Sequence, residues 1–469
     1  MRTAKLTQVA SAIVMAIGLS TSAMAADTSS SMRGKILNPD GNAAANVKIT
    51  VLHQPSGTTR EFITNDSGSF VANGLRVGGP YTVVIDSDTY SDASLENIFL
   101  NLGDTFRVNQ QLESLNIERI EVTGNRYLQT AGGSNSVFGG EAINNAPSFN
   151  RDIKDVARMN PLATINGNGE LVFAGSNPRT NSLTVDGISQ NDDFGLNYGG
   201  YPTQQPPVAL DAIEQISVDV SPFSAKKGNF GGGTVNAVTK SGSNDFTFSG
   251  FAETSTPSMA GDVQKIDAIT ENGRDVLDAD GHKTYETSMV SPIVTVERFG
   301  FNVGGPIIKD KLFFFANFEA ERRSDAGSNF LAAATGVTGE NVSRVSAADL
   351  DMVSDALFNQ FGYETGPYQG YLLETNNQKG IFKLDWNASK NTTITATYNF
   401  LDAYKEKPAH PSALGRRGPD LTTLQFKNSG YRINNIIHSG LIEAKSIIPS
   451  PIIPLSKSIS FVRESQSQT

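Results

Sequence analysis

The second half of the chain alternates apolar and polar residues over long stretches. Aromatic and aliphatic residues take every second position at 299–303, 312–318, 382–386 and 394–400. Side chains at alternate positions of a β-strand point to opposite faces of the sheet. The pattern therefore predicts strands with one apolar and one polar face, and the polar run 309–311 predicts a tight turn between two of them.

The residues on the polar face indicate what surrounds this sheet. Lys383 and Asp385 alternate with Phe382, Leu384 and Trp386, and aromatic residues stand at both ends of the strands. Lipid outside and water inside a transmembrane antiparallel β-barrel favour this arrangement, whereas a water-soluble sheet rarely needs it. Beyond the N-terminus no run of roughly 18 apolar residues occurs, which excludes helical membrane spans.

The first part of the chain has shorter strands separated by frequent turns. Aliphatic residues alternate with polar residues at 47–51 and again at 81–85. Asn65–Gly68 and Gly78–Pro80 have the composition of turns, because Asn, Asp and Gly tolerate the backbone conformations that turns require. Turns spaced at about 8–12 residues predict a small β-sandwich over residues 26–115.

Residues 125–243 mix helix and strand signals. Asp152 is placed to cap a helix whose apolar positions share one face, and Pro161 is placed to end it. A short helical turn is predicted at Ala209–Ile213. The predicted strands are Ser182–Val185, Gln215–Val220 and Thr234–Val238. The fold class is therefore mainly β, with a sandwich, an α/β domain and the first part of a barrel.

The first 25 residues have the composition of a signal peptide. Arg2 and Lys5 precede a short apolar stretch that ends in a small-x-small motif. Cleavage is predicted between Ala25 and Ala26, which sends the mature chain out of the cytoplasm.

Composition narrows the function classes. The chain has 469 residues, a formal net charge of −10 and no cysteine. The absence of cysteine excludes disulfides, cysteine-based zinc sites and thiol catalysis. An acidic chain without a basic cluster argues against a nucleic-acid partner.

No metal, cofactor or catalytic site is predicted. None of the four histidines (His53, His282, His410, His438) is followed by Glu three residues later, as a zinc peptidase requires. A phosphate loop needs Gly directly before its Lys-Ser or Lys-Thr pair, but Thr239 precedes Lys240 here, so the glycine run does not predict a phosphate loop. A calcium loop with Gly281 at its sixth position would begin at Val276 and end at Thr287. Neither residue has the carboxylate that the loop requires at these positions.

Two segments resemble known domains. The sandwich resembles the carboxypeptidase regulatory-like, prealbumin-like domain at Gly34–Ile36, Asn38–Gly41, Asn65–Phe70 and Gly79–Tyr81. Three fragments in order resemble the plug domain of TonB-dependent outer-membrane receptors: Asn181–Ile188, Ile213–Val218 and Gly228–Gly242. The run Phe299–Phe315 resembles the Oar-like branch of these receptors, which also carry the regulatory-like domain.

The resemblance implies roles for particular residues. The extended segment before the plug would be the TonB box, made of Ile117, Glu118, Arg119, Ile120, Glu121, Val122 and Thr123. Plug structure would rest on Asp186, Gly187, Gly231, Gly232 and Gly233, with the glycines close to the barrel wall. Pairing with barrel-wall carboxylates, or an exposed surface role, is open for Arg151, Arg158 and Arg179.

The barrel segment is short for such a receptor. Residues 245–469 have room for about eight to ten strands, whereas a plugged receptor has about 22. Three prolines and a run without Gly or Asp make the tail atypical, which suggests a fragment or a frameshift. The expected segments are a signal peptide (1–25), a sandwich (26–115), a TonB-box-like segment (116–124), a plug (125–243), a partial barrel (244–445) and an atypical tail (446–469).

The expected function is that of a TonB-dependent receptor and transporter in the outer membrane of a Gram-negative bacterium. Its partners would be TonB, outer-membrane lipid and an extracellular ligand, with an iron chelate, an oligosaccharide and a peptide all open. No covalent chemistry is expected. The alternative is a secreted or surface-located adhesin or carbohydrate-binding β protein without transport activity.

Overall fold

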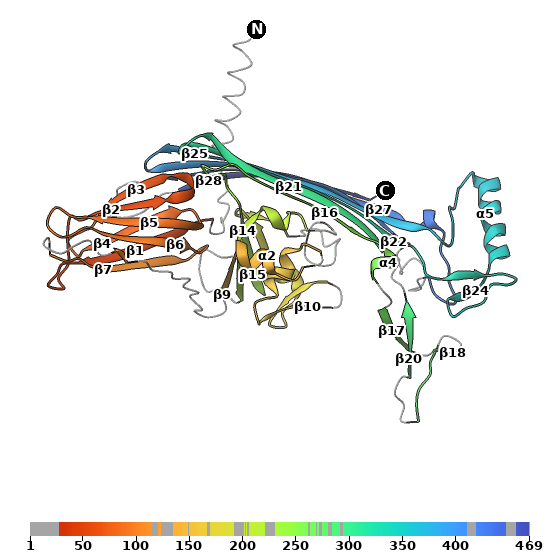
Figure 1. The fold of residues 1–469 in the computed structure, drawn as a ribbon. Helices are drawn as coiled ribbons and strands as arrows, with labels where there is room; N and C mark the ends of the chain where they lie inside the picture. Colours follow the sequence, from red (N-terminus) through yellow and green to blue (C-terminus); the bar gives the residue numbers. More distant parts are fainter. Residues whose placement is uncertain are drawn as a thin grey trace, which may run out of the picture.

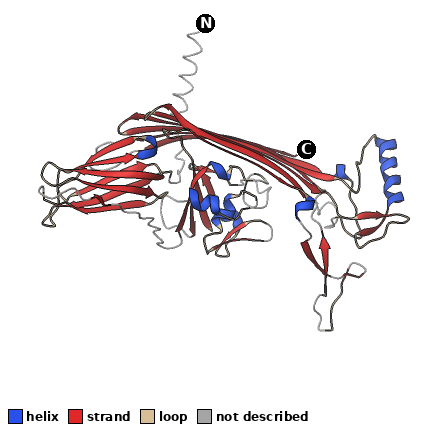
Figure 2. Cartoon of the chain, in the orientation of Figure 1, coloured by secondary structure: helices blue, strands red, loops and turns tan. Residues whose placement is uncertain are grey.

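The computed structural model contains three bodies that follow one another along the chain (Figure 1). A β-sandwich is followed by a small mixed domain, and a long twisted sheet extends beyond both (Figure 2). The structure describes residues 28–468 except 115–120, 123–134, 149, 167–168, 192–200, 202, 204–205, 221–229, 261–262, 269, 272–273, 280–283, 291–293, 410–418 and 447–455. The predicted signal peptide and its cleavage site between Ala25 and Ala26 lie outside the described residues.

The sandwich consists of a three-stranded sheet, in the order β4-β1-β7, and a five-stranded sheet, in the order β3-β2-β5-β6-β8. Apolar side chains from both sheets, among them Met32, Ile36, Ile49, Ile85 and Leu100, are completely buried between them. The strands are β1 (Ser30–Leu37), β2 (Lys48–His53), β3 (Thr58–Ile63), β4 (Ser69–Leu75), β5 (Gly78–Asp86), β6 (Ala93–Leu100), β7 (Thr105–Gln111) and β8 (Glu121–Val122), with a 3-10 turn η1 (Gln54–Ser56) after β2.

The predicted turns of the sandwich have different outcomes. The turn at Asn65 is confirmed: its Oδ1 accepts hydrogen bonds from the backbone N–H of Ser67 and of Ser69, both at 3.0 Å, and Gly68 has φ +70°. The turn predicted at Gly78–Pro80 is wrong, because β5 already begins at Gly78. Its pairing with β6 is irregular between Gly78 and Tyr81, so these residues form a bulge within the strand.

The second body is a five-stranded mixed sheet in the order β13-β12-β15-β14-β9, covered by short helices. The predicted helix is confirmed as α3 (Ile153–Ala157), and the Asp152 carboxylate caps it by accepting the Lys154 N–H at 2.9 Å. The other elements are β9 (Asn135–Gly139), α2 (Gly140–Asn145), β10 (Ala163–Ile165), β11 (Leu171–Phe173), η2 (Pro178–Thr180), β12 (Ser182–Val185), β13 (Ile188–Ser189), η3 (Leu210–Ala212), β14 (Ile213–Val220) and β15 (Gly233–Thr239).

The third body is a seven-stranded antiparallel sheet in the order β16-β21-β22-β25-β26-β27-β28. Short turns at Lys309–Lys311 and Ser389–Asn391 join neighbouring strands, as predicted. The strands are β16 (Thr247–Ser255), β21 (Val294–Ile308), β22 (Leu312–Ala326), β25 (Leu372–Ser389), β26 (Thr392–Lys407), β27 (Tyr431–Ser446) and β28 (Ser456–Gln468).

The two faces of this sheet are the reverse of those of a water-soluble protein. The apolar side chains of Phe299, Trp386 and Ile442 are 53%, 43% and 53% exposed. Lys383 and Asp385 point the other way and are only 5% and 2% exposed. The predicted alternation of an apolar outer face and a polar inner face is therefore confirmed.

The number and length of the strands differ from the prediction. The described residues form seven strands in this sheet, not eight to ten, because the five from β21 to β27 are 15–18 residues long instead of about ten. The tail was expected to stand apart from the fold, yet β28 pairs along its length with β27. Strand pairing uses backbone groups that any residue except proline provides, and all three prolines precede β28.

The connections at the end of the sheet away from the short turns are long and have structure of their own. The loop between β22 and β25 contains the helix α5 (Ala347–Phe361). The remaining elements are α4 (Pro257–Ala260), β17 (Val263–Ala268), β18 (Thr270–Glu271), β19 (Arg274–Asp275), β20 (Tyr285–Val290), β23 (Leu331–Ala333), β24 (Val342–Ser346) and η5 (Lys427–Ser429). No helix among the described residues is long and apolar enough to cross a membrane.

A buried histidine makes the sandwich sensitive to acid. The His53 ring is 8% exposed, its Nδ1 lies 2.7 Å from Ser56 Oγ, and it packs against the Tyr81 ring. Burial, with a smaller effect of the positive charge of Arg76, lowers the pKa of His53 to about 3. The unfolded chain takes up this proton near pH 6.5, so the sandwich loses stability as the pH falls from 6.5 toward 3.

We expect the substitution His53→Asn to reduce this acid sensitivity. Between pH 7.5 and pH 4.5 the unmodified chain should lose roughly 3 kcal/mol more unfolding free energy than the variant, following the cited pKa shift. The difference in unfolding free energy is measured by urea titration at each pH, with hydrogen exchange of the β2 amides as the signal. His438→Gln, which removes an exposed histidine, is the control, and equal losses in all three chains would contradict the prediction.

Candidate functional site

Charged side chains line the inner face of the long sheet where the second body contacts it. Glu319, Glu321, Lys379, Lys383 and Asp385 are each at most 6% exposed. An isolated buried charge is unstable unless partners and hydrogen bonds compensate for lost water. The positions and chemistry of those partners define the candidate site, which joins the second body to the barrel wall.

Arg151 is the centre of the first cluster. Its guanidinium pairs with Asp211 of its own domain and with two carboxylates of the long sheet, Glu253 at 3.3 Å and Glu319 at 3.7 Å. It also lies over the Phe251 ring, 3.8 Å from the ring centre. One side chain therefore connects strands β16 and β22 to the domain inside.

The backbone at Arg151 is held in an unfavourable conformation. Its φ of +52° is in the left-handed region, which costs a non-glycine residue roughly 1–2 kcal/mol. The next residue, Asp152, is fixed both by capping α3 and by accepting the Tyr201 hydroxyl at 2.6 Å. Burial and the neighbouring Asp152 charge raise the pKa of Tyr201, so its proton stays in this hydrogen bond. The surrounding contacts thus hold Arg151 against the wall.

A second layer of ion pairs supports the first. Arg298 donates to Glu321 through Nε at 2.6 Å and reaches Glu253 at 3.2 Å. Lys379 pairs with Glu319 at 2.9 Å and donates to the Pro206 carbonyl oxygen at 3.0 Å. The carboxylate of Glu319 is therefore shared between a barrel lysine and Arg151 of the inner domain.

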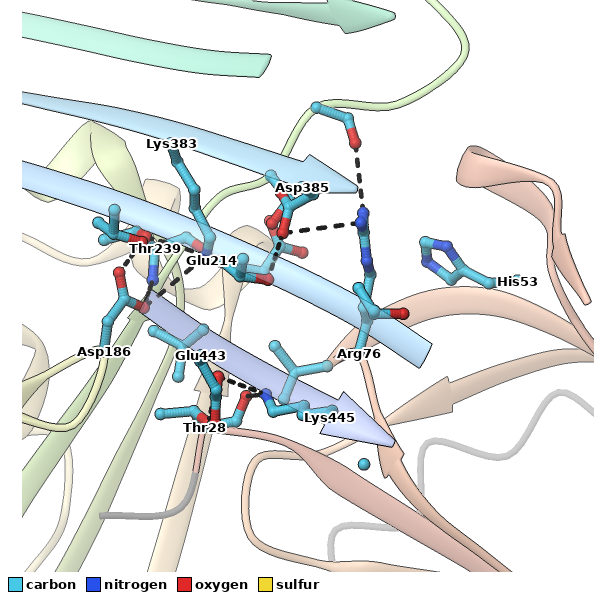
Figure 3. Close-up of a pocket in the computed structure, with 18 of the residues that line it drawn as sticks. Thr28, His53, Arg76, Asp186, Glu214, Thr239, Lys383, Asp385, Glu443 and Lys445 are labelled. Carbon is cyan, nitrogen blue, oxygen red and sulfur yellow. Dashed lines mark hydrogen bonds and ion pairs between the residues drawn. The ribbon is translucent and has the colours of Figure 1, made fainter. Parts of the chain in front are cut away.

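Asp186 lies at a second contact with the wall (Figure 3). It occupies the turn between β12 and β13 with φ +48°, followed by Gly187 at φ +81°. Its carboxylate accepts the N–H of Thr239 at 3.0 Å and the Thr239 hydroxyl at 2.5 Å. Lys383 of β25 donates to the Thr239 carbonyl oxygen at 3.1 Å and lies 3.9 Å from Asp186. The turn is therefore linked to the barrel wall.

The glycines contact the inner domain itself, not the barrel wall, so that part of the prediction is wrong. The N–H groups of Gly231 and Gly232 donate to the Thr180 carbonyl oxygen at 2.6 and 3.3 Å. A Cβ atom at Gly233 would lie 2.5 Å from the Phe173 ring. These glycines therefore pack closely against β11 and the segment around η2 of the same domain. The sequence alone does not show which elements lie this close.

The contacts described for Arg158 and Arg179, the other two arginines considered in the sequence, lie within the inner domain. Arg158 pairs with Asp155 at 3.8 Å and donates to the Pro147 carbonyl oxygen at 3.1 Å, so these contacts lie within the inner domain. Arg179 lies in η2, where its backbone N–H donates to Asn177 Oδ1 at 3.1 Å.

Only two residues of the predicted TonB box are described. Glu121 and Val122 form β8, which pairs in parallel with β6 opposite Ser94 and Leu95. Ile117–Ile120 and Thr123 lie outside the described residues. The described part of this segment is thus extended and occupies an edge of the sandwich.

The sequence placed Lys383 on the polar face and left open the pairing of Arg151 with wall carboxylates, which the structure shows, but it did not identify those carboxylates. Glu319 and Glu321 alternate with Phe318 and Ala320, which indicated their face but not their partners. No group of three or more metal-binding side chains occurs among the described residues.

Comparison with known proteins identifies two domains. The sequence model of the carboxypeptidase regulatory-like domain matches residues 31–113, and that of an outer membrane beta barrel domain matches residues 272–444. The TonB-dependent transporter Oar of Myxococcus xanthus is 27% identical over 325 residues, which cover 65% of this chain and 28% of Oar. The chain is a homologue of TonB-dependent transporters.

A second sequence relative and a solved structure with a similar fold extend the comparison. A probable TonB-dependent siderophore receptor, PirA of Acinetobacter baumannii, is 26% identical over 46% of this chain and 27% of its own length. The outer membrane transporter YddB of Escherichia coli covers 67% of this chain and 37% of its own, with 12% identity and a TM-score of 0.43. The chain spans a little over a quarter of the length of the two sequence relatives. The match to the outer membrane beta barrel domain and the two sequence relatives place the chain in the outer membrane of a Gram-negative bacterium.

Removing the central arginine should loosen the inner domain. We expect Arg151→Ala to lower its stability by about 1–3 kcal/mol, because buried carboxylates lose their partner. With a urea m-value near 2 kcal/mol/M, the unfolding midpoint should fall by about 1 M. Because the chain has no cysteine, maleimide labelling of a single Ser217→Cys reporter in β14 measures this transition.

Arg158→Ala is the matched control. Its ion pair is with Asp155 of the same domain and its side chain is 42% exposed, so it should cost about 0–1 kcal/mol. If the two alanine variants expose the reporter at the same urea concentration, Arg151 does not hold the domain to the wall.

Proposed function

We propose that this chain acts in TonB-dependent uptake across the outer membrane, with residues 125–243 as the plug inside the barrel wall. The observation that carries the proposal is the contact between the plug and the polar inner face of the sheet through Arg151 and Lys383. A polar contact of this kind can be exchanged for water when the plug moves. The proposed ligand binds from outside and is too large or too scarce to enter through porins.

TonB would bind the segment Ile117–Thr123 by strand addition, in which backbone hydrogen bonds provide the affinity. The extended backbone of Glu121 and Val122 supports this, because these residues already pair as a strand. A pull on this segment would then displace the plug. Binding and displacement require no covalent chemistry, so we propose no enzymatic activity. Iron chelate, oligosaccharide and peptide all remain in the proposal as ligand classes.

The secreted adhesin is the less favoured alternative. Aromatic side chains such as Phe248, Phe299 and Trp386 are exposed on the outer face of the long sheet. A surface of this kind on a water-soluble protein would promote association, whereas lipid covers it in a membrane. Recovery of the expressed chain from the soluble periplasm instead of the outer membrane would favour the adhesin.

We expect Val122→Pro to weaken binding of the purified periplasmic domain of TonB roughly tenfold or more, because proline removes a backbone donor from the added strand. Calorimetric titration of the chain in detergent measures the dissociation constant. Glu121→Gln is the control, because it changes a side chain and keeps every backbone donor. Equal affinities for the proline variant and the unmodified chain would exclude this segment as the TonB site.

A further inference from the structure

The sandwich is bonded to the plug and to the barrel wall at the same time. It lies beside the plug near one end of the long sheet (Figure 1). This is the end with the short turns at Lys309–Lys311 and Ser389–Asn391. Asn387, next to the second turn, donates to Thr58 Oγ1 of the sandwich at 2.8 Å. Thr28, just before β1, also donates through its hydroxyl to the Glu443 carboxylate of β27 at 2.9 Å. Three further groups of contacts among the described residues each involve a different loop or strand end of the sandwich.

The first contact is a buried glutamine of the plug. Gln215 in β14 is 5% exposed, and both atoms of its carboxamide bind the sandwich backbone. Its Oε1 accepts the Leu102 N–H at 2.9 Å, and its Nε2 donates to the Leu100 carbonyl oxygen at 3.0 Å. The carboxamide therefore makes the same donor and acceptor pair of hydrogen bonds that a neighbouring β-strand would make. These two bonds exist only while the sandwich is docked.

The second contact is an arginine of the sandwich that reaches both other bodies (Figure 3). Arg76 donates through Nη1 to the Gly242 carbonyl oxygen at 3.4 Å, where the plug leads into β16. Its Nη2 lies 3.7 Å from Asp385 Oδ1 on the barrel wall, and the guanidinium lies over the Phe313 ring. The buried Asp385 carboxylate thus has a charged partner from the sandwich.

The third contact is made by the loop and strand around η1. The Asn244 N–H donates to the Pro55 carbonyl oxygen at 2.7 Å. Arg60 donates through Nη1 to the Asn73 carbonyl oxygen within the sandwich at 3.1 Å, and through Nη2 to Thr393 Oγ1 of β26 at 3.3 Å. Nearly all of these contacts are polar, in contrast to the apolar cores on either side.

A cavity of about 170 Å³ lies where the three bodies meet. Its lining is polar and includes Arg76 of the sandwich, Asp186 and Glu214 of the plug, and Lys383 and Asp385 of the wall. Water can enter a polar cavity of this size and replace the contacts as the surfaces separate. Polar interfaces between domains commonly allow relative motion.

We propose that the sandwich is a latch: docked through Gln215 and Arg76, it holds the plug against the barrel wall, and it must leave before the plug can move. The docking does not depend on the proposed transport. Only the consequence for uptake rests on the proposed function, so the test measures docking without TonB and without ligand.

The experiment compares two double variants of the full chain in detergent. Arg76→Ala with Gln215→Ala removes the two central contacts. Arg107→Ala with Gln111→Ala is the matched control, because Arg107 is exposed on β7 and Gln111 bonds to Pro39 within the sandwich. Nitroxide labels on Val71→Cys and Lys390→Cys, both exposed positions, report the distance between sandwich and wall.

The unmodified chain and the control should give one narrow distance distribution, and the Arg76/Gln215 variant a broad one. Hydrogen exchange of β14 in the plug should accelerate roughly tenfold, the effect of losing about 1.4 kcal/mol of contacts. Exchange in β1 should not change, which distinguishes undocking from unfolding of the sandwich. A narrow distribution in the Arg76/Gln215 variant, or undocking without faster exchange in β14, would overturn the proposal.

Discussion

The arrangement of the three bodies depends on ion pairs and hydrogen bonds to the charged side chains on the inner face of the long sheet. Its outer face is apolar, so the charged side chains of Glu319, Lys379, Lys383 and Asp385 all point inward. Buried without partners, each would cost several kcal/mol. The inner domain, the proposed plug, provides partners through Arg151 and the Thr239 backbone, and the sandwich provides another through Arg76. The long sheet, the inner domain and the sandwich are therefore parts of one electrostatic arrangement.

An interface made in this way differs from a hydrophobic core in what it permits. Separating apolar surfaces exposes them to water at a cost that grows with area, but separated charges and amides regain hydrogen bonds from water. The strained backbone at Arg151 (φ +52°) is consistent with such a separable contact. The ion pairs of its guanidinium offset the conformational free energy only while the side chain lies on the wall. The proposed plug is thus held in one position by contacts that water can replace.

Much of the fold follows from local pattern. The period of two in β21, β22, β25 and β26 predicted strands and the face of each residue, and Asp152 predicted the start of α3. Pattern could not decide what lies opposite a face: pairing of Arg151 with a wall carboxylate stayed one of two alternatives, and the partners of Gln215 were missed. The tail shows the same limit, since β28 pairs through its backbone, and pairing of this kind is independent of the unusual side-chain composition.

The same sheet of the sandwich takes part in both proposals. β8, from the segment proposed to bind TonB, pairs with β6 at Ser94 and Leu95. β6 ends at Leu100, whose carbonyl oxygen accepts from Gln215 of the plug. β8 is the edge strand of this sheet, so a partner that adds to it by strand addition joins the same sheet that docks on the proposed plug. Under the two proposals, coupling to TonB and release of the latch therefore act on neighbouring strands of one sheet, and neither requires a change inside the core of the proposed plug.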